Sequence, residues 1–211
     1  MLSRFKRVTN QIIDRIRDNF TDSIQAKIHT ADAIINIIAE ASEEILQALL
    51  AGHKILTCGN GGSACTAMHF SSKMLNRFKH ERPSLPVIAL STDVATLTAI
   101  ANDYHASDMF AKQIRALGQA NDVLLAISSS GNAVSILNAI KAAHDKQMHV
   151  IALTGHHGGK LAEYLSEQDI EIRVPALDTA RIQETHLLII HCLCDIIDFR
   201  LFGAGDNTHD T

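Results

Sequence analysis

The second part of the chain alternates short apolar runs with longer segments of helical character, and this alternation constrains the fold more than any other feature. Five runs rich in Val, Ile and Leu end at Gly, Ser, Thr or Pro, and they are KILTCG (54–59), PVIALS (86–91), DVLLAIS (122–128), HVIALTG (149–155) and IEIRVP (170–175). Continuous apolar strands are buried on both faces, and helices between strands allow parallel pairing. The pattern predicts an α/β fold with a five-stranded parallel sheet and helices on both faces.

The segments between the runs are long enough for helices. We expect helices over Ser63–Lys79, Thr92–Ala101, Ser107–Leu117, Ala133–Lys146 and Ala180–Phe202, with Lys160–Leu165 as a helix or a loop. Before the first strand, apolar residues recur at helical spacing from about Phe5 to Ala51, and Gly52 provides a stop. Packing on the domain covers part of this apolar surface, and we expect another subunit to cover the rest. The chain thus divides into an N-terminal helical region (1–52) and a domain with a C-terminal helix (53–211), which form one structural unit.

Composition and charge exclude several classes of protein. The 211 residues are 46% hydrophobic, enough to bury the core of one α/β domain, and the net charge of −4 gives no general affinity for nucleic acid. We expect the basic run RFKHERP (77–83) to be solvated surface. The N-terminus lacks the apolar core of a signal peptide, and no apolar stretch is long enough to span a membrane. The four cysteines lack C-x-x-C spacing, which favours reduced thiols in a cytoplasmic protein over a zinc site.

The first predicted strand runs into the glycine-rich turn CGNGGSA. In open parallel sheets, ligands bind beyond the carboxyl ends of the strands, where loops lead into helix N-termini. Gly59, Gly61 and Gly62 allow tight turns and a close approach of backbone to ligand, and Asn60 can hydrogen-bond hydroxyl groups. We expect Ser63 to cap the following helix and count it with this candidate binding loop. The turn is neither G-x-G-x-x-G nor a P-loop, so a steric role for the glycines stays open.

A second candidate loop, AISSSGN, follows the third predicted strand. Ser128, Ser129 and Ser130 precede Gly131-Asn132 and a predicted helix. Hydroxyl groups and free N–H groups at a helix N-terminus bind phosphate without Lys or Arg. An ordinary serine-rich turn is the alternative, but two candidate loops at neighbouring strand ends favour a phosphate site.

Two further strand-end segments give weaker indications. Asn102 and Asp103 in ANDYH could reach sugar hydroxyls, although such a pair is usually a turn. ALTGHHGG resembles the binding loops, but we expect a surface turn with His156 and His157 solvated.

Polar side chains share a face on two predicted helices. His69 and Lys73 are four residues apart, and Gln183 and His191 share a face of the last helix, with His186 off to one side. A lone helical histidine is more often structural than a ligand, and a dependable zinc site needs three or four ligands.

In combination, several segments are similar to one known family. They are CGNGGSACTAMHF, RPSLPVIAL, IANDY, KQIRALGQANDVLLAISSSGN, VIALTG, GGKLA, IEIRVP and ARIQETHLLIIHCLCDIID. The chain resembles the SIS (sugar isomerase) domain from about Phe20 to Phe202, and within it the phosphoheptose isomerase group. That group includes sedoheptulose 7-phosphate isomerases and the replication initiator-associating (DiaA) proteins. The resemblance implies a Rossmann-like three-layer fold, a homotetramer with its N-terminal helices in a central bundle, and phosphosugar sites near subunit interfaces.

The resemblance also assigns residues. It implies ligand contacts at Asn60, Gly61, Gly62, Asn102, Asp103, Ser128, Ser129, Ser130 and Gln183. It implies zinc ligands at His69, Gln183 and His191, with His191 also as an acid/base. Lys73 stands where the isomerases have a glutamate that is both a zinc ligand and the base, Thr66 where they usually have an aspartate, and Ala133 where the phosphate loop has its last serine.

Two functions follow from these departures. The chain is either an isomerase that converts sedoheptulose 7-phosphate to D-glycero-D-manno-heptose 7-phosphate, a precursor of lipopolysaccharide, or a non-catalytic tetrameric adaptor that binds the replication initiator protein DnaA. Isomerisation requires a base at carbon and an acid at oxygen, and a lysine, cationic at neutral pH, repels a metal ion. The retained His191 favours the enzyme, whereas Lys73 favours the adaptor.

Overall fold

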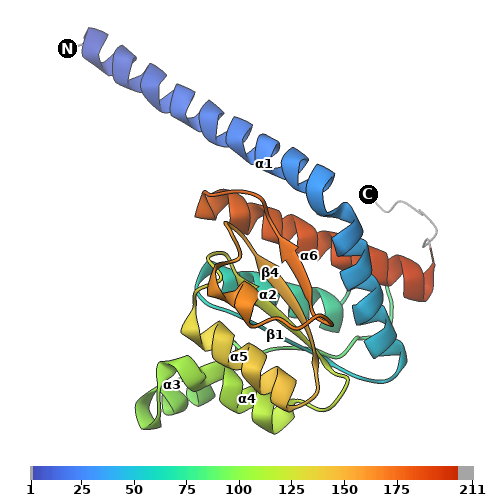
Figure 1. Cartoon of the computed structure of the whole chain (residues 1–211). Helices are drawn as coiled ribbons and strands as arrows, with labels where there is room; N and C mark the ends of the chain where they lie inside the picture. The colour runs from blue at the N-terminus through green and yellow to red at the C-terminus, as the bar shows by residue number, and fades with distance from the viewer. Residues whose placement is uncertain (1, 204–211) are drawn as a thin grey trace.

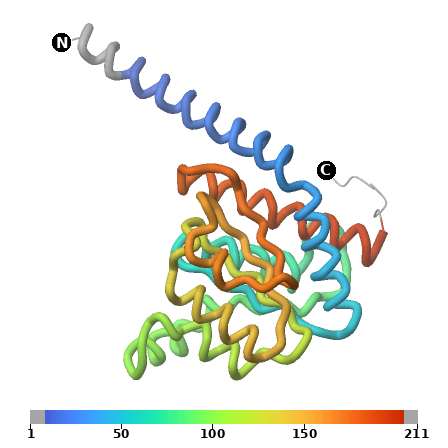
Figure 2. Tube along the Cα trace, in the orientation of Figure 1, coloured from blue at the N-terminus to red at the C-terminus, as the bar shows by residue number. Residues whose placement is uncertain are grey.

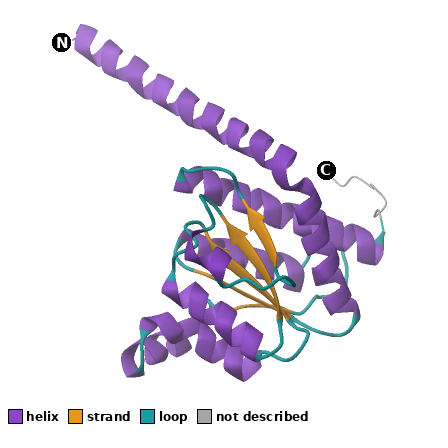
Figure 3. Cartoon of the chain, viewed as in Figure 1, coloured by secondary structure: helices purple, strands orange, loops and turns teal. Residues whose placement is uncertain are grey.

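The computed structural model describes residues 2–203, with side chains described from Thr9 onward. Its centre is a five-stranded parallel sheet of β1 (Ile55–Gly59), β2 (Val87–Ala89), β3 (Val123–Ser128), β4 (His149–Thr154) and β5 (Ile170–Arg173). The strand order is β2-β1-β3-β4-β5 (Figure 3). The chain leaves β1 for β2 on one side and then returns to β3 on the other, so the loops after β1 and β3 flank the point where the strand order reverses.

Helices cover both faces of the sheet (Figure 1). One face carries α1 (Leu2–Leu50), α2 (Gly62–Leu75) and α6 (Thr179–Phe202), and the other carries α4 (Met109–Leu117) and α5 (Val134–Asp145). Beside α4 lie α3 (Val94–Asp103) and the short η1 (Ala106–Asp108), and η2 (Gly159–Glu163) follows β4. Alternate strand residues, such as Leu124 and Leu125 of β3, enter the two separate cores. The strands are apolar throughout because both of their faces are buried.

The helix α1 has two parts with different surroundings. From Ile34 to Ala48 its buried side chains join the core shared with α2 and α6. Its earlier part extends past the domain (Figure 2) and exposes large apolar side chains, from Ile12 to Ile28, of which Phe20 is 69% exposed. The structure therefore leaves uncovered the apolar surface for which the sequence predicts another subunit.

All five strands and the long helices lie where the sequence predicts them, and the α/β three-layer fold is confirmed. Two details at α2 are corrected. The predicted cap, Ser63, lies inside the first helical turn, and Gly61 occupies the cap position without a side-chain hydrogen bond. The helix ends at Leu75 rather than at Lys79, because the chain turns back and the N–H of Leu85 donates to the carbonyl of Met74. Within residues 2–203, no helix has the length and hydrophobicity to cross a membrane.

Candidate active site

The two predicted binding loops lie next to each other at the carboxyl edge of the sheet. Gly59 of β1 pairs with Ile127 of β3, directly before the serine loop (Ser128–Asn132). A side-chain hydrogen bond also joins the glycine-rich loop to the first turn of α5, since the Asn60 amide donates to the Ser135 hydroxyl at 2.8 Å. A Cβ on Gly59 would lie 2.5 Å from the carbonyl oxygen of Ser63, so only glycine allows this turn. The two loops that the sequence singles out therefore lie side by side at one edge of the sheet.

The serine loop leads into α5 with its donor groups available. Ser128 is buried, and its hydroxyl accepts from the N–H of Gly131 at 3.2 Å, while the exposed Ser130 accepts from the N–H of Asn132 at 3.3 Å. Ala133 occupies the cap position of α5 and offers no side-chain acceptor. The first N–H groups of α5 thus lack a capping side chain, and the positive end of the helix dipole is open to an anion. This arrangement can bind a phosphate group.

A pair of histidines joins α2 to α6 on the other side of the sheet. The Nε2 atoms of His69 and His191 are 2.8 Å apart, and the two rings meet edge to face with centroids 5.0 Å apart. Phe78 packs near His191, with the ring centroids 5.7 Å apart. Burial lowers the pKa of His69, and the nearby His191 and Lys73 lower it further. His69 is therefore neutral at pH 7, and one of the two facing nitrogens donates while the other accepts.

Gln183 contacts the glycine-rich loop from the first turns of α6. A Cβ on Gly62 would lie 2.6 Å from Oε1 of Gln183, so the amide packs directly against this loop. Two pairs of predicted residues therefore meet between α2 and α6, Gly62 with Gln183 and His69 with His191, although more than a hundred residues separate the two helices in the sequence. Donors and acceptors along this contact can hold the hydroxyl and carbonyl groups of a sugar.

The first turns of α6 are held in place by α1. The Ser23 hydroxyl donates to Glu184 at 2.6 Å, Lys27 lies 3.8 Å from the same carboxylate, and Arg181 donates to the carbonyl of Asn19. These contacts flank Gln183 on both sides, so α1 positions a candidate ligand residue. No pattern in the sequence indicated this role for the helix.

Lys73 lies one turn after His69, on the same side of α2. In the part of the chain that the structure describes, its ammonium group forms no hydrogen bond or ion pair with a carboxylate, and its charge acts on His69 and on Cys194. Burial raises the pKa of the Cys194 thiol to about 12, so this neighbour is a neutral thiol. The lysine therefore brings an unneutralised positive charge to the cluster.

The run RFKHERP differs from its prediction, because Arg82 is buried rather than solvated. Its Nε lies 2.6 Å from Asp198 of α6, and its guanidinium donates to the carbonyls of Lys73 at 2.8 Å and Met74 at 2.9 Å. The Arg82 side chain is 1% exposed. It caps the C-terminal end of α2 and ties that end to α6, the two helices that carry His69 and His191.

Some predicted site residues are not brought into these contacts. Asn102 and Asp103 form the exposed end of α3, and their only described side-chain hydrogen bond joins them to each other at 2.8 Å. His186 is a core residue, as its position off the shared face suggested. It lies 2.8 Å from the carbonyl of Thr154, and burial lowers its pKa to about 4.

The loop after β4 departs from its prediction at one of its two histidines. His157 is exposed, as predicted, whereas His156 is half-buried, and both line a pocket of about 290 Å³ with Ser130, Asn132 and Gly159. The HH dipeptide next to glycines was the only available signal in the sequence.

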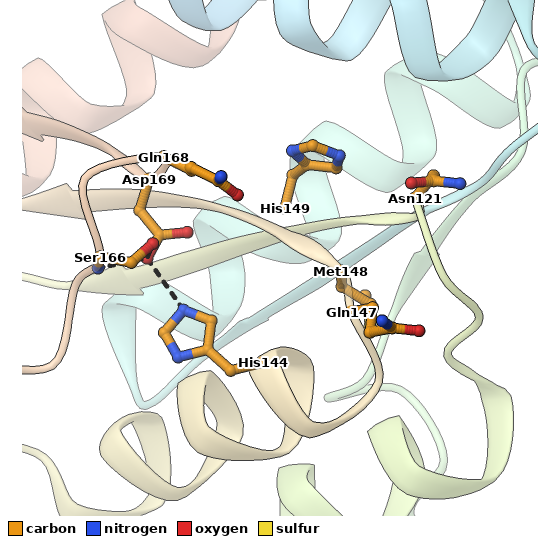
Figure 4. Close-up of a pocket in the computed structure, with 8 residues that line it drawn as sticks. All are labelled: Asn121, His144, Gln147, Met148, His149, Ser166, Gln168 and Asp169. Carbon is orange, nitrogen blue, oxygen red and sulfur yellow. Dashed lines mark hydrogen bonds and ion pairs between the residues drawn. The ribbon is translucent and has the colours of Figure 1, made fainter.

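A second pocket, of about 440 Å³, lies at the opposite, amino edge of the sheet (Figure 4). Its carboxylate, Asp169, lies 2.8 Å from Nε2 of His144 and accepts from Ser166 and from the N–H of Val150. This carboxylate already has hydrogen-bond partners in its own loop, in α5 and in β4, so we assign it a structural role.

Comparisons with known proteins agree with this geometry. The SIS domain family matches residues 13–155. The phosphoheptose isomerase of Chromohalobacter salexigens is 57% identical over 91% of this chain and 98% of its own length, and that of Shewanella oneidensis is 58% identical over 92% and 99%. The structure of a phosphoheptose isomerase from Francisella tularensis superposes with a TM-score of 0.86, at 53% identity, over 88% of this chain and 97% of its own. The chain belongs to the SIS-domain family and, within it, to the phosphoheptose isomerases. These relatives do not favour the initiator-binding adaptor.

The donor set does not fit the zinc ion that the family resemblance implies. His69 and His191 direct their Nε2 atoms at each other at hydrogen-bond distance, Gln183 is neutral, and the charge of Lys73 opposes a divalent cation. Within the described residues, no group of three or more His, Cys, Asp or Glu side chains could hold a metal ion.

Proposed function

We propose that this chain interconverts sedoheptulose 7-phosphate and D-glycero-D-manno-heptose 7-phosphate. The observation that carries the proposal is the hydrogen-bonded pair of His69 and His191, on the same two helices that bring Gln183 against the glycine-rich loop, at the sheet edge that also carries the serine loop. The serine loop and the N-terminus of α5 bind the phosphate, and the histidine pair faces the C1–C2 end of the sugar.

The reaction needs one base at carbon and one acid at oxygen. His191, to which we assign the base, takes a proton from C1 of the ketose, which leaves an enediolate with its negative charge on the oxygen at C2. The proton of the C1 hydroxyl moves to the oxygen at C2, and C2 then takes the proton back from His191 as C1 becomes the aldehyde. Because His69 holds the other end of the hydrogen bond, it orients His191 and can exchange the proton with it. The Lys73 ammonium stabilises negative charge that develops on the enediol oxygens.

Proton NMR of the purified chain with sedoheptulose 7-phosphate in D2O tests this proposal. We expect the signal of an aldose anomeric proton to appear and the C1 protons of the ketose to exchange with deuterium. Parallel samples with added zinc and with a chelator show whether a metal ion contributes. Absence of both conversion and exchange in every sample would exclude the isomerase activity.

The same experiment separates the enzyme from the adaptor. Lys73 favours the adaptor, since it replaces a carboxylate base in the resemblance. An adaptor would leave sedoheptulose 7-phosphate unchanged. In a separate pull-down, immobilised DnaA would retain an adaptor chain. An isomerase gives the reverse pair of results.

We also propose that the chain acts in the cytoplasm as a homotetramer. The four cysteines are free thiols in the structure, which suits a reducing compartment. The exposed apolar stripe of α1, including Ile16, Phe20 and Ile24, suits packing against α1 of other copies. Light scattering after size-exclusion chromatography tests the assembly, and aspartate at both Ile16 and Phe20 is expected to yield smaller species.

A further inference from the structure

A second pair of histidines lies beside the serine loop and takes no part in the proton transfers described above. His156 and His157 line one pocket with Ser130, Asn132 and Gly159. We propose that these two histidines form a wall of the phosphate subsite and bind the phosphate monoester of the substrate. The inference rests on the proposed function, because it takes the serine loop as the place where the phosphate binds.

The loop that carries the histidines is held against the serine loop by its backbone. A Cβ on Gly131 would lie 1.8 Å from the carbonyl oxygen of Gly158, and a Cβ on Gly159 would lie 2.4 Å from that of Ser130. The N–H of Lys160 also donates to the Asn132 side chain at 3.0 Å, and the N–H of Leu161 donates to the carbonyl of Gly131 at 2.9 Å. The two loops therefore form one unit, and the histidines keep their positions beside the serine hydroxyls.

The backbone of His156 shows which substitution can test its side chain. Its φ angle is 51°, in the left-handed region, where His, Asn and Asp are enriched among residues other than Gly. The neighbouring positions with positive φ in this loop, 158 and 159, are glycines. The conformation therefore suits an imidazole side chain, and asparagine can replace it without new strain.

The charged groups near the pocket are already engaged in contacts of their own. The serine loop contains no Lys or Arg. Arg173, beneath Gly158, is already paired with Glu171. Asp178 accepts backbone N–H groups at the start of α6, and these bonds lower its pKa, as does nearby His156.

Lys160 is exposed, and its backbone rather than its ammonium contacts the loop. The histidines are thus the ionisable side chains that line the pocket itself. Imidazole N–H groups donate well to phosphate oxygens and gain strength when the ring is charged.

Calorimetric titration of the full chain with sedoheptulose 7-phosphate, combined with steady-state kinetics, tests the inference. Asparagine is the substitution of choice, since it tolerates the positive φ at position 156. We expect Kd and KM to rise roughly fivefold to tenfold in each of His156→Asn and His157→Asn, with kcat within about twofold, because the phosphate is remote from the reacting carbons. His157→Lys keeps a cation and should bind within about threefold of the wild type.

His149→Asn, at the opposite edge of the sheet, serves as the matched control and should leave Kd unchanged. Unfolding midpoints and titration with unphosphorylated sedoheptulose show whether a variant disturbs the whole site. Equal weakening for the neutral sugar would overturn the inference. Unchanged binding by the double variant His156→Asn/His157→Asn, together with weaker binding by Ser130→Ala, would also overturn the inference. The proposed function would then stand. A wild-type chain that binds no sugar phosphate would instead refute the proposed function itself.

Discussion

The two faces of α6 carry histidines of the same chemical type with opposite roles. His186 faces the sheet, is fully buried and meets the carbonyl of Thr154, so burial keeps it neutral by lowering its pKa to about 4. His191 faces α2, is half-buried and meets another imidazole. The first has one fixed partner and serves packing, whereas the second has a partner that can also exchange a proton. The role of each histidine is therefore set by the face it occupies and by what lies opposite.

Replacing His191 should have the largest effect on function. In His191→Asn the volume and some hydrogen bonding remain, but no group can accept the carbon-bound proton. We expect kcat to fall by about 10²- to 10⁴-fold, the usual contribution of a general acid or base. The Kd for sedoheptulose 7-phosphate should change little, because the phosphate binds elsewhere. Wild-type kcat in this variant would assign the base to another residue.

Breaking the buried contact of α6 with α2 should have the largest effect on stability. Arg82→Ala leaves the Asp198 carboxylate, which is 7% exposed, without its partner and removes the cap from α2. We expect the free energy of unfolding to fall by about 3–5 kcal/mol, as measured by urea denaturation.

The matched control for this variant is Arg200→Ala, at an exposed position of α6. Arg200 pairs with Glu43 at 2.7 Å, and both side chains are more than 40% exposed. Its loss should cost less than about 1 kcal/mol. Equal losses for Arg82 and Arg200 would contradict the distinction between the two faces.

Acid should act on the sheet-facing side of α6 through His186. Its pKa is about 4 in the folded chain, below the ordinary value of 6.5, so below pH 6.5 the unfolded chain binds the proton and the folded chain does not. The stability present above pH 6.5 should then decrease by about 3 kcal/mol as the pH falls to 4. Urea denaturation of the wild type and of His186→Gln over this range isolates the contribution. Parallel curves would mean that His186 is not the responsible group.

The fold and the residues that share a face of α6 could be predicted from the sequence. The contacts between distant elements could not, for physical reasons. Strand positions follow from continuous apolar runs, and helical periodicity placed Gln183 and His191 on one face with His186 aside. The burial of Arg82 was missed, because a local basic run carries no sign of an acceptor on α6 far along the chain. The half-burial of His156 was missed in the same way, since the loop that it packs against follows another strand. Contacts within one element were predictable, and contacts between distant elements were not.

A carboxylate at position 73 of α2 should create a metal site between α2 and α6. Lys73→Glu removes the charge that opposes a divalent cation and adds an anionic donor one turn from His69, beside His191 and Gln183. We expect one equivalent of zinc to bind this variant on the order of a hundredfold more tightly than the wild type, because three or four convergent donors then include a negative charge. Competition with a chromogenic chelator measures the affinity, and Lys112→Glu on α4 makes the same charge change in the opposite helical layer. If the wild type binds zinc as tightly as Lys73→Glu does, the ammonium must turn away from the histidines, and its role at the enediol oxygens is lost. If only Lys73→Glu binds zinc, the cation of the wild-type site is the lysine itself.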